Sequence, residues 1–555
     1  MHALRAAPDS VTSMVLRRGR TIGRARAGWV LGTAAAAGVL GSCYLRFGAA
    51  VSVNSDGAAF AMQAWDMLHG NLLLHGWVLS DVSFYTTELP QYMLVEAVKG
   101  LSPAVIHVAA AMTYTLVLLL AAVLAKGTAT GREGVVRAVI AAGIMVAPQV
   151  SAGRVLMAQP EHIGTSVPIL AALLVLDRSR RRWQVPVIVC LLLAWVLIAD
   201  QLVAIAVIAP LIVTGGLRAY RELVPSGGEQ PDGRLVFPWL TGLPGRLQWA
   251  RYDLALAAAG LIALIVAQVA VAVIIAHGGY AKAPLSTAVV SATQMPGQVW
   301  TGVESVLLLF GADPFGLPLS ATLLLALLHL AGVGLAAWAM VRGTRRFLAD
   351  QDLVNQLLVT GIAIVLTAFL FGWRLRGTFS AHEISVVLPM AAVLAGRVLA
   401  RPLACSRALP ALVLVLAGYG VGLGHDATLP PVAAQNASLA SWLTAHHLRD
   451  GLAPYWQADS LALDSGGSRT LTTVIASGKV LVPYRWEVES AWYDPSRQYA
   501  NFVVTVRTPR AQSWPATPAE AEASFGAPER TYRYRNYVIQ VWPENLLTLL
   551  RPGRG

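Results

Sequence analysis

Residues 49–103 read AAVSVNSDGAAFAMQAWDMLHGNLLLHGWVLSDVSFYTTELPQYMLVEAVKGLSP. They separate the first long apolar run of the chain from the second, and they carry five acidic residues and two histidines. Their middle part, GAAFAMQAWDMLHG, places apolar side chains at the spacing of one helix face. A stretch this acidic and aromatic is more than a connector, and it predicts a structured loop with surface helices.

The composition on either side of this loop excludes an ordinary soluble protein. Of 555 residues, 56% are hydrophobic and 13% are charged, whereas soluble domains carry about 25% charged residues. This balance is typical of a polytopic membrane protein. The net charge of +12 therefore indicates no nucleic-acid partner, and what matters is where the arginines and lysines lie.

Apolar periodicity predicts an α-helical polytopic membrane protein with about eleven transmembrane helices. Several of the runs are shorter than the ~20 residues that cross a bilayer directly. The stretch 185–217 is interrupted only by Asp200-Gln201, which predicts two short spans that meet near the outer surface. The expected spans are 28–48, 103–125, 135–150, 161–177, 185–199, 202–217, 252–276, 318–341, 355–373, 384–400 and 408–424.

The basic residues predict the orientation of these spans. With the N-terminus inside, 24 arginines and lysines fall in the inner segments and 6 in the outer loops that precede the C-terminal region, as the positive-inside rule requires. We therefore expect a cytoplasmic basic N-terminus at 1–27 and a transmembrane domain at 28–424, with 49–102 as its first extracytoplasmic loop. Residues 425–555 would form an extracytoplasmic soluble domain.

This C-terminal region has the pattern of a small α/β domain. An amphipathic helix is predicted at 438–448, and Thr517-Pro518-Ala519-Glu520 is a capping box that starts another. The segment 531–542, TYRYRNYVIQVW, predicts two strands around a turn. The three cysteines imply neither a disulfide framework nor a thiolate metal site, and the chain has no Walker loop or metal-binding motif. We expect no metal and no cofactor.

Ionisable residues at the outer ends of the spans are the candidates for function, because charges in lipid are costly and usually retained for a purpose. Asp56 directly follows the first span, although Ser55 or Asp56 could equally be the N-cap of the next helix. Asp200 is either a polar cap between two short helices or a site residue. Glu161-His162 lacks metal-motif spacing, which favours a structural role. The candidates are Asp56, Glu88, Asp200, Arg374, Arg376, His382 and Glu383.

Arg374 and Arg376 are the clearest cations of the predicted outer half. As an interfacial anchor they would extend to the lipid headgroups. As a functional pair they would clamp a phosphate, because guanidinium groups match phosphate oxygens.

The chain resembles the GT-C superfamily of integral-membrane glycosyltransferases, which includes protein mannosyltransferases and the aminoarabinose transferase of lipid A. The resemblance rests on Asp56 after the first span in NSDGAAFAMQAWDMLHG, and on the turn YTTELPQY before the second. Short, broken spans and an outer C-terminal domain complete it. Many members carry two adjacent acids in this loop, whereas Gly57 follows Asp56 here, which argues against a metal-assisted mechanism.

The resemblance implies a hexosyl- or pentosyltransferase that takes a sugar from a polyprenyl-phosphate donor in the membrane. Asp56 would be the general base for the acceptor hydroxyl, and Arg374 or Arg376 would hold the donor phosphate. Glu88 would assist Asp56, while Asp200, His382 and Glu383 would bind substrate. The acceptor would be an envelope glycan, lipid or protein at the outer face of a bacterial plasma membrane.

Two other functions fit parts of the pattern. Broken spans with a carboxylate between them also occur in transporters, so a transporter or flippase of a lipid-linked envelope component is the alternative. A scaffold whose outer domain binds envelope partners is the third hypothesis.

Overall fold

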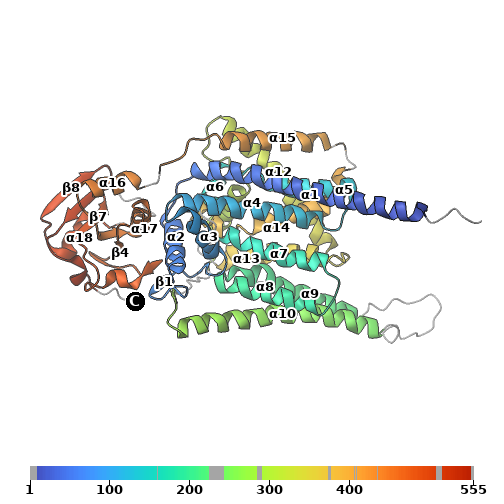
Figure 1. Cartoon of the computed structure of the whole chain (residues 1–555), viewed down its shortest axis with the longest axis horizontal. Helices are drawn as coiled ribbons and strands as arrows, with labels where there is room; N and C mark the ends of the chain where they lie inside the picture. The colour runs from blue at the N-terminus through green and yellow to red at the C-terminus, as the bar shows by residue number, and fades with distance from the viewer. Residues whose placement is uncertain are drawn as a thin grey trace, which may run out of the picture.

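The computed structural model is mostly helical, with a sheet-containing domain at its C-terminal end (Figure 1). Side chains are described from residue 28 onward, except for 29 and 243–246. The described residues are 9–158, 161–223, 243–283, 290–372, 377–404, 407, 409–433, 436–507 and 516–551.

Each of the eleven expected spans corresponds to a helix. Eight helices are long and apolar enough to cross a membrane among the described residues, or nine if one bent pair counts as a span. The chain is thus a multi-pass membrane protein. The eleven helices are α1 (Asp9–Ala49), α4 (Ala104–Lys126), α5 (Gly131–Met145), α7 (His162–Arg178), α8 (Gln184–Ala199), α9 (Ala209–Leu223), α10 (Leu243–Ala276), α12 (Ala321–Arg346), α13 (Leu353–Gly372), α14 (Val387–Ala404) and α15 (Leu409–Asp426).

Two interruptions of these helices follow from local sequence. The predicted break at Asp200 is present, because α8 ends at Ala199 and a π-helix, η1 (Ala204–Ile208), leads into α9. The span expected at 135–150 ends earlier. α5 stops at Met145 and α6 (Val150–Leu156) continues at an angle of 95°. Pro148 lies in this bend, where its ring prevents a continuous helix.

The first helix is longer than the first span. Helix α1 begins at Asp9, whereas its part that is apolar enough to cross a membrane is Val30–Ala49, close to the predicted start at residue 28.

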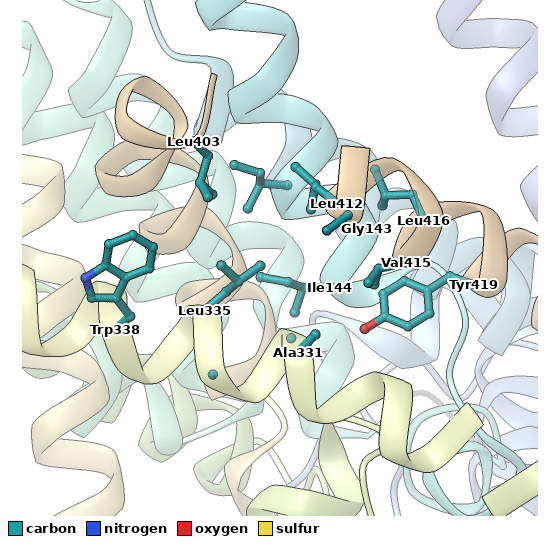
Figure 2. A pocket seen from close by; sticks show the side chains of 14 residues that line it. Gly143, Ile144, Ala331, Leu335, Trp338, Leu403, Leu412, Val415, Leu416 and Tyr419 are labelled. Atoms are coloured by element: carbon teal, nitrogen blue, oxygen red, sulfur yellow. The ribbon is translucent and has the colours of Figure 1, made fainter. Parts of the chain in front are cut away.

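The spans pack closely where small residues meet neighbouring backbones. A side chain at Gly361 of α13 would lie 2.6 Å from the carbonyl oxygen of Ala206 in η1, so glycine permits this contact. Helix α15 does not fill the space beside its neighbours completely. An apolar cavity of about 290 Å³ lies between α5, α12 and α15, with Trp338 and Tyr419 in its wall (Figure 2).

Helices α2 (Ser55–Leu68) and α3 (Glu88–Lys99) lie between the ends of the spans and the C-terminal domain (Figure 1). We call this end of the bundle the domain side and the opposite end the far side. The apolar face of α2 packs on α3 and α4 in one cluster that includes Phe60 and Tyr92. The first loop is thus the structured element that its sequence predicted.

The C-terminal domain is built on a six-stranded sheet with strand order β5-β4-β3-β7-β9-β8. The predicted hairpin is present as antiparallel β8 (Arg530–Tyr534) and β9 (Tyr537–Val541), and the Thr517–Glu520 capping box starts α18 (Pro518–Phe525). The helix predicted at 438–448 is α16 (Ala437–Ala445). The remaining elements are β3 (Gly451–Pro454), α17 (Tyr455–Asp464), β4 (Leu471–Ser477), β5 (Val480–Pro483) and β7 (Phe502–Val506).

A second, three-stranded sheet joins this domain to the bundle. Strand β1 (Trp77–Leu79) of the first loop pairs with β2 (Ala281–Lys282), which follows α10, and with β6 (Val488–Glu489) of the C-terminal domain. Helix α17 also contacts α2. The C-terminal domain is therefore fixed directly against the loop that carries Asp56.

Buried charges on the far side are enclosed by partners. One nitrogen of Arg397 lies 2.8 Å from Asp177 and 2.6 Å from Asp352, and another donates to the Leu124 carbonyl at 2.8 Å. Arg218 pairs in the same way with Asp253, at 3.4 Å. Because these contacts link α4, α7, α9, α10, α13 and α14, they hold the far ends of the spans together.

Candidate functional site

Asp56 lies in the first turn of α2 and is not its cap. The N-cap is Asn54, whose side-chain oxygen accepts a hydrogen bond from Gly57 N at 3.0 Å. The alternative in which Ser55 or Asp56 is the N-cap is therefore excluded. Asn54 also donates to Asp56 Oδ2 at 3.1 Å. The first turn of α2 therefore fixes the position of the half-buried Asp56 carboxylate. Because Asn54 caps the helix, this carboxylate stays available for other contacts.

The C-terminal domain covers Asp56 with the first residue of α17. The Tyr455 hydroxyl donates a hydrogen bond to Asp56 Oδ1. The Ser55 hydroxyl in turn donates to the Tyr455 carbonyl at 2.6 Å, which fixes the start of α17 against the start of α2.

Two further acids of the C-terminal domain lie near this contact. Glu487 accepts hydrogen bonds from the Gln63 side chain and from Ser80 N, the latter at 3.0 Å. Asp459 is fully buried, and neither of its oxygens has a hydrogen-bond partner among the described residues. Glu487 has a positive φ of 52°, a strained conformation that concentrates at functional sites.

These surroundings change the acidity of the carboxyl groups. Burial, reinforced by the negative charge of Glu161, raises the pKa of Asp56 to about 7, against the opposing effect of the Tyr455 hydrogen bond. Burial likewise raises the pKa of Glu487 to about 7. An acid whose pKa lies close to 7 is suited to accept a proton at neutral pH and release it again.

A second group of titratable residues is centred on His162, at the start of α7. Its Nδ1 lies 2.8 Å from Asp200 Oδ2, and its Nε2 lies 3.4 Å from Glu383 Oε2. The other oxygen of Glu383 lies 3.4 Å from His382 Nε2. Asp200 is held in place by Thr165, whose hydroxyl donates to it at 2.6 Å. Asp200 comes from the break after α8, and the His382-Glu383 pair comes from the 3-10 helix η2 (Gly377–Ile384).

Glu88 lies beside this second group. It is the first residue of α3, and its carboxyl group packs directly on Gly164 of α7, where an added Cβ would force the Glu88 side chain to move. Thr87 donates to one carboxyl oxygen, while the other is buried without a partner among the described residues. Burial, with the charge of Asp200 nearby, raises the pKa of Glu88 well above its ordinary value.

The two groups are electrostatically connected. The charges of Glu161 and His382 both act on the pKa of Asp56. Lys282 of β2 adds a cation to this region. Burial lowers the pKa of Lys282, and the nearby negative charges of Asp81 and Asp200 partly offset that lowering. One charged region, formed by the first loop, the domain-side span ends and α17, therefore surrounds Asp56.

The structure brings most of the predicted site residues to this region. Glu88, Asp200, His382 and Glu383 lie together around His162, and Asp56 lies in the neighbouring group. Arg374 and Arg376 lie outside the described residues. The Asp200 side chain has three hydrogen-bond partners, His162, Thr165 and Leu202 N. The first two lie on α7, so the contacts favour more than a simple cap between two short helices.

Sequence reasoning missed four residues of the region. His162 was assigned a structural role because it has no motif partner nearby in sequence. Tyr455, Asp459 and Glu487 gave no signal, since they lie about 400 residues from the first loop and only the fold places them there. That Asp459 and Glu487 are buried close to Asp56 becomes visible only in three dimensions.

No family model matches the chain, and no curated protein matches its sequence. Among solved structures, the chain is similar to ArnT from Cupriavidus metallidurans bound to undecaprenyl phosphate, with a TM-score of 0.54 and 13% sequence identity. The match covers 95% of this chain and 99% of that chain. At this identity the similarity shows the fold alone, and it confirms the expected architecture of membrane helices followed by a small C-terminal α/β domain.

Proposed function

From this ArnT-like fold, we propose that the protein is a membrane glycosyltransferase that moves a sugar from a polyprenyl-phosphate donor to a cell-envelope acceptor, with Asp56 as general base. The observation that carries the proposal is the position of Asp56. It is a half-buried acid with a pKa of about 7, at the junction of the spans and the C-terminal domain. The solved neighbour, bound to undecaprenyl phosphate, supports the donor class.

The chemistry assigned to Asp56 is a proton transfer coupled to substitution. The acceptor hydroxyl attacks the anomeric carbon of the donor sugar, and its proton passes to a carboxylate oxygen of Asp56. The bond between that carbon and the phosphate oxygen breaks, and polyprenyl phosphate leaves. Attack opposite the leaving group inverts the configuration at the sugar carbon.

Charge on the departing phosphate needs a cation. Lys282 is a candidate within the described region, because it lies close enough to Asp81 and Asp200 for their charges to act on its pKa. We assign the same role to Arg374 and Arg376, by the resemblance to GT-C enzymes. Glu88 supports the site through its contact with α7 rather than by touching Asp56.

The test uses the full-length protein in lipid nanodiscs with labelled polyprenyl-phosphate hexoses and pentoses, and cell-envelope extract as acceptor. Wild-type protein is expected to transfer label covalently to the extract. Asp56→Asn, which keeps the shape and removes the base, is expected to lower transfer by about 10²–10⁴-fold.

Asp66→Asn is the matched control, because Asp66 lies on the same helix and accepts hydrogen bonds from Asn71 and Trp77. It is expected to retain transfer. A second assay uses the same protein in sealed lipid vesicles. Label that crosses the vesicle membrane, without covalent transfer in the nanodisc assay, would replace the proposal with the flippase alternative. Full transfer by Asp56→Asn would remove Asp56 from the mechanism.

A further inference from the structure

The apolar cavity between α5, α12 and α15 has no part in the proposed sugar transfer. Its wall consists of aliphatic side chains, alanine and glycine, together with Trp338 and Tyr419 (Figure 2). The Tyr419 hydroxyl is already used, because it donates to the Leu328 carbonyl at 3.1 Å. An apolar cavity of this kind stays dry and takes up apolar molecules. The lining therefore suits a hydrocarbon chain.

Two walls of the cavity belong to helices that face the membrane. Of the apolar windows of α12 and α15, 28% and 22% of the residues are buried inside the protein. Most of the surface of both helices therefore contacts lipid. Trp338, which forms part of the cavity wall, is itself 43% exposed. A lipid chain can thus enter from the surrounding leaflet without passing through the core of the bundle.

The last turns of α12 extend the cavity wall with cations. Trp338, Arg342 and Arg345 follow one another at spacings of four and three residues in this helix, so they lie on one face. Side chains of a helix lean toward its N-terminus, which directs the Arg342 side chain toward the turn of Trp338. This face therefore changes from hydrocarbon to guanidinium at the far end of the span.

The protein supplies no anion to these arginines. Arg342 and Arg345 form no ion pair with any residue that the structure describes. The buried Nε of Arg342 also has no hydrogen-bond partner among those residues. Asp352, just before α13, pairs with Arg397 instead. A buried donor without an acceptor is costly, and phosphate oxygens match the geometry of a guanidinium group.

The position of the arginines indicates where a phosphate comes from. The positive-inside rule predicts that the far side is cytoplasmic. The cytoplasmic leaflet carries anionic lipids, and basic pockets between membrane spans on this side bind their headgroups. The donor of the proposed function would place its phosphate near Asp56, at the opposite end of the spans. A phospholipid of the far-side leaflet is therefore the ligand that fits this cavity.

We propose that this cavity binds one anionic phospholipid, with an acyl chain between α5, α12 and α15 and the headgroup phosphate on Arg342 and Arg345. The site is separate from the glycosyltransferase proposal, because it lies at the other end of the bundle and its binding is measured without a sugar donor.

The first experiment titrates full-length protein in detergent with phosphatidylglycerol or phosphatidylcholine of identical chains and counts bound lipids by native mass spectrometry. Wild-type protein is expected to retain one phosphatidylglycerol per chain and to prefer it to phosphatidylcholine. The double variant Arg342→Gln and Arg345→Gln is expected to lose about 30-fold in affinity for phosphatidylglycerol, because each cation near a headgroup contributes about fivefold.

The matched control is the double variant Arg180→Gln and Arg182→Gln. These arginines are also exposed and lie between α7 and α8, away from the cavity. The control removes the same charge from the same side of the bundle and is expected to bind phosphatidylglycerol as wild type does.

A second variant tests the seat of the acyl chain. Gly334 lines the cavity, and an added Cβ there meets no atom within 4 Å, so Gly334→Leu fills the space without a clash. It is expected to weaken binding of both phospholipids while the arginines stay in place. Phosphatidylglycerol is also expected to raise the melting temperature of wild-type protein more than that of either cavity variant, because a ligand that binds the folded state stabilises it.

The proposal is overturned if wild-type protein binds the two phospholipids equally, or if the Arg342 and Arg345 variant keeps wild-type affinity for phosphatidylglycerol. Unchanged binding by Gly334→Leu would remove the acyl chain from the cavity. Displacement of phosphatidylglycerol by an equal amount of polyprenyl phosphate would assign the cavity to the donor instead. Loss of sugar transfer in Asp56→Asn with intact lipid binding would leave the lipid site standing, and loss of lipid binding with intact transfer would leave the glycosyltransferase proposal standing.

Discussion

The two ends of the bundle differ in how their buried charges are paired. On the far side, Arg397 is enclosed by Asp177, Asp352 and a backbone carbonyl, so each charge has a partner. On the domain side, Asp56, Asp459 and Glu487 gather around one tyrosine hydroxyl. A balanced buried network holds helices together, whereas an excess of one sign is the condition of a site that meets protons or ligands.

The largest effect is expected from removing Arg397, the centre of the far-side ion pairs. Arg397→Met removes the cation that pairs with both Asp177 and Asp352 and leaves Asp177 only the ion pair with Arg178; we expect it to lower the free energy of unfolding by about 3–5 kcal/mol. Denaturant titration in detergent measures this. Arg178→Met is the control, because Arg178 also pairs with Asp177 but its side chain is 43% exposed, and its loss should cost at most about 1 kcal/mol. Equal losses would contradict the structural role of Arg397.

On the domain side, the comparison predicts a pH effect on turnover instead. The pKa of Asp56 is raised to about 7, so the carboxylate that accepts the proton is lost as the pH falls through 7. Transfer is expected to drop about tenfold per pH unit below this value. The same raised pKa means that ionised Asp56 opposes folding, so Asp56→Asn should unfold at the same or a higher temperature than wild type at pH 8. A transfer rate that stays constant down to pH 5 would contradict the assignment.

The smallest effect concerns the tyrosine that covers Asp56. The Tyr455 hydrogen bond lowers the pKa of Asp56, so Tyr455→Phe should shift the acidic limb of the pH profile upward, with a loss of less than about tenfold in transfer at pH 7. Tyr499→Phe removes a hydroxyl that bonds to the Pro543 carbonyl at an exposed position and should leave the limb unmoved. A shift in both variants would indicate a general effect on the C-terminal domain.

Apolar periodicity predicted much of the fold, because the long hydrophobic helices and the break at Asp200 depend on residues that are adjacent in the sequence. The α18 capping box and the β8–β9 hairpin are equally local. The bend at Pro148 and the N-cap at Asn54 were not predicted, because apolar periodicity does not fix a helix end to within one or two residues.

The candidate site was predictable only in part. Asp56, Glu88 and Asp200 stood out because each is an acid beside an apolar run. His162 gained its partners from two other segments, and Asp459 looked like any polar residue of a small domain. A single sequence does not indicate which side chains about 400 residues apart will be in contact, because that contact arises only when the whole chain is packed.

The three-stranded sheet has a consequence for how the protein is made. Its strands come from residues 77–79, 281–282 and 488–489, and Tyr455 is synthesised 399 residues after Asp56. The acid is therefore exposed on the newly inserted spans throughout most of translation. Only the last part of the nascent chain gives it its final environment, so a polypeptide that terminates early contains every span and still lacks a finished site.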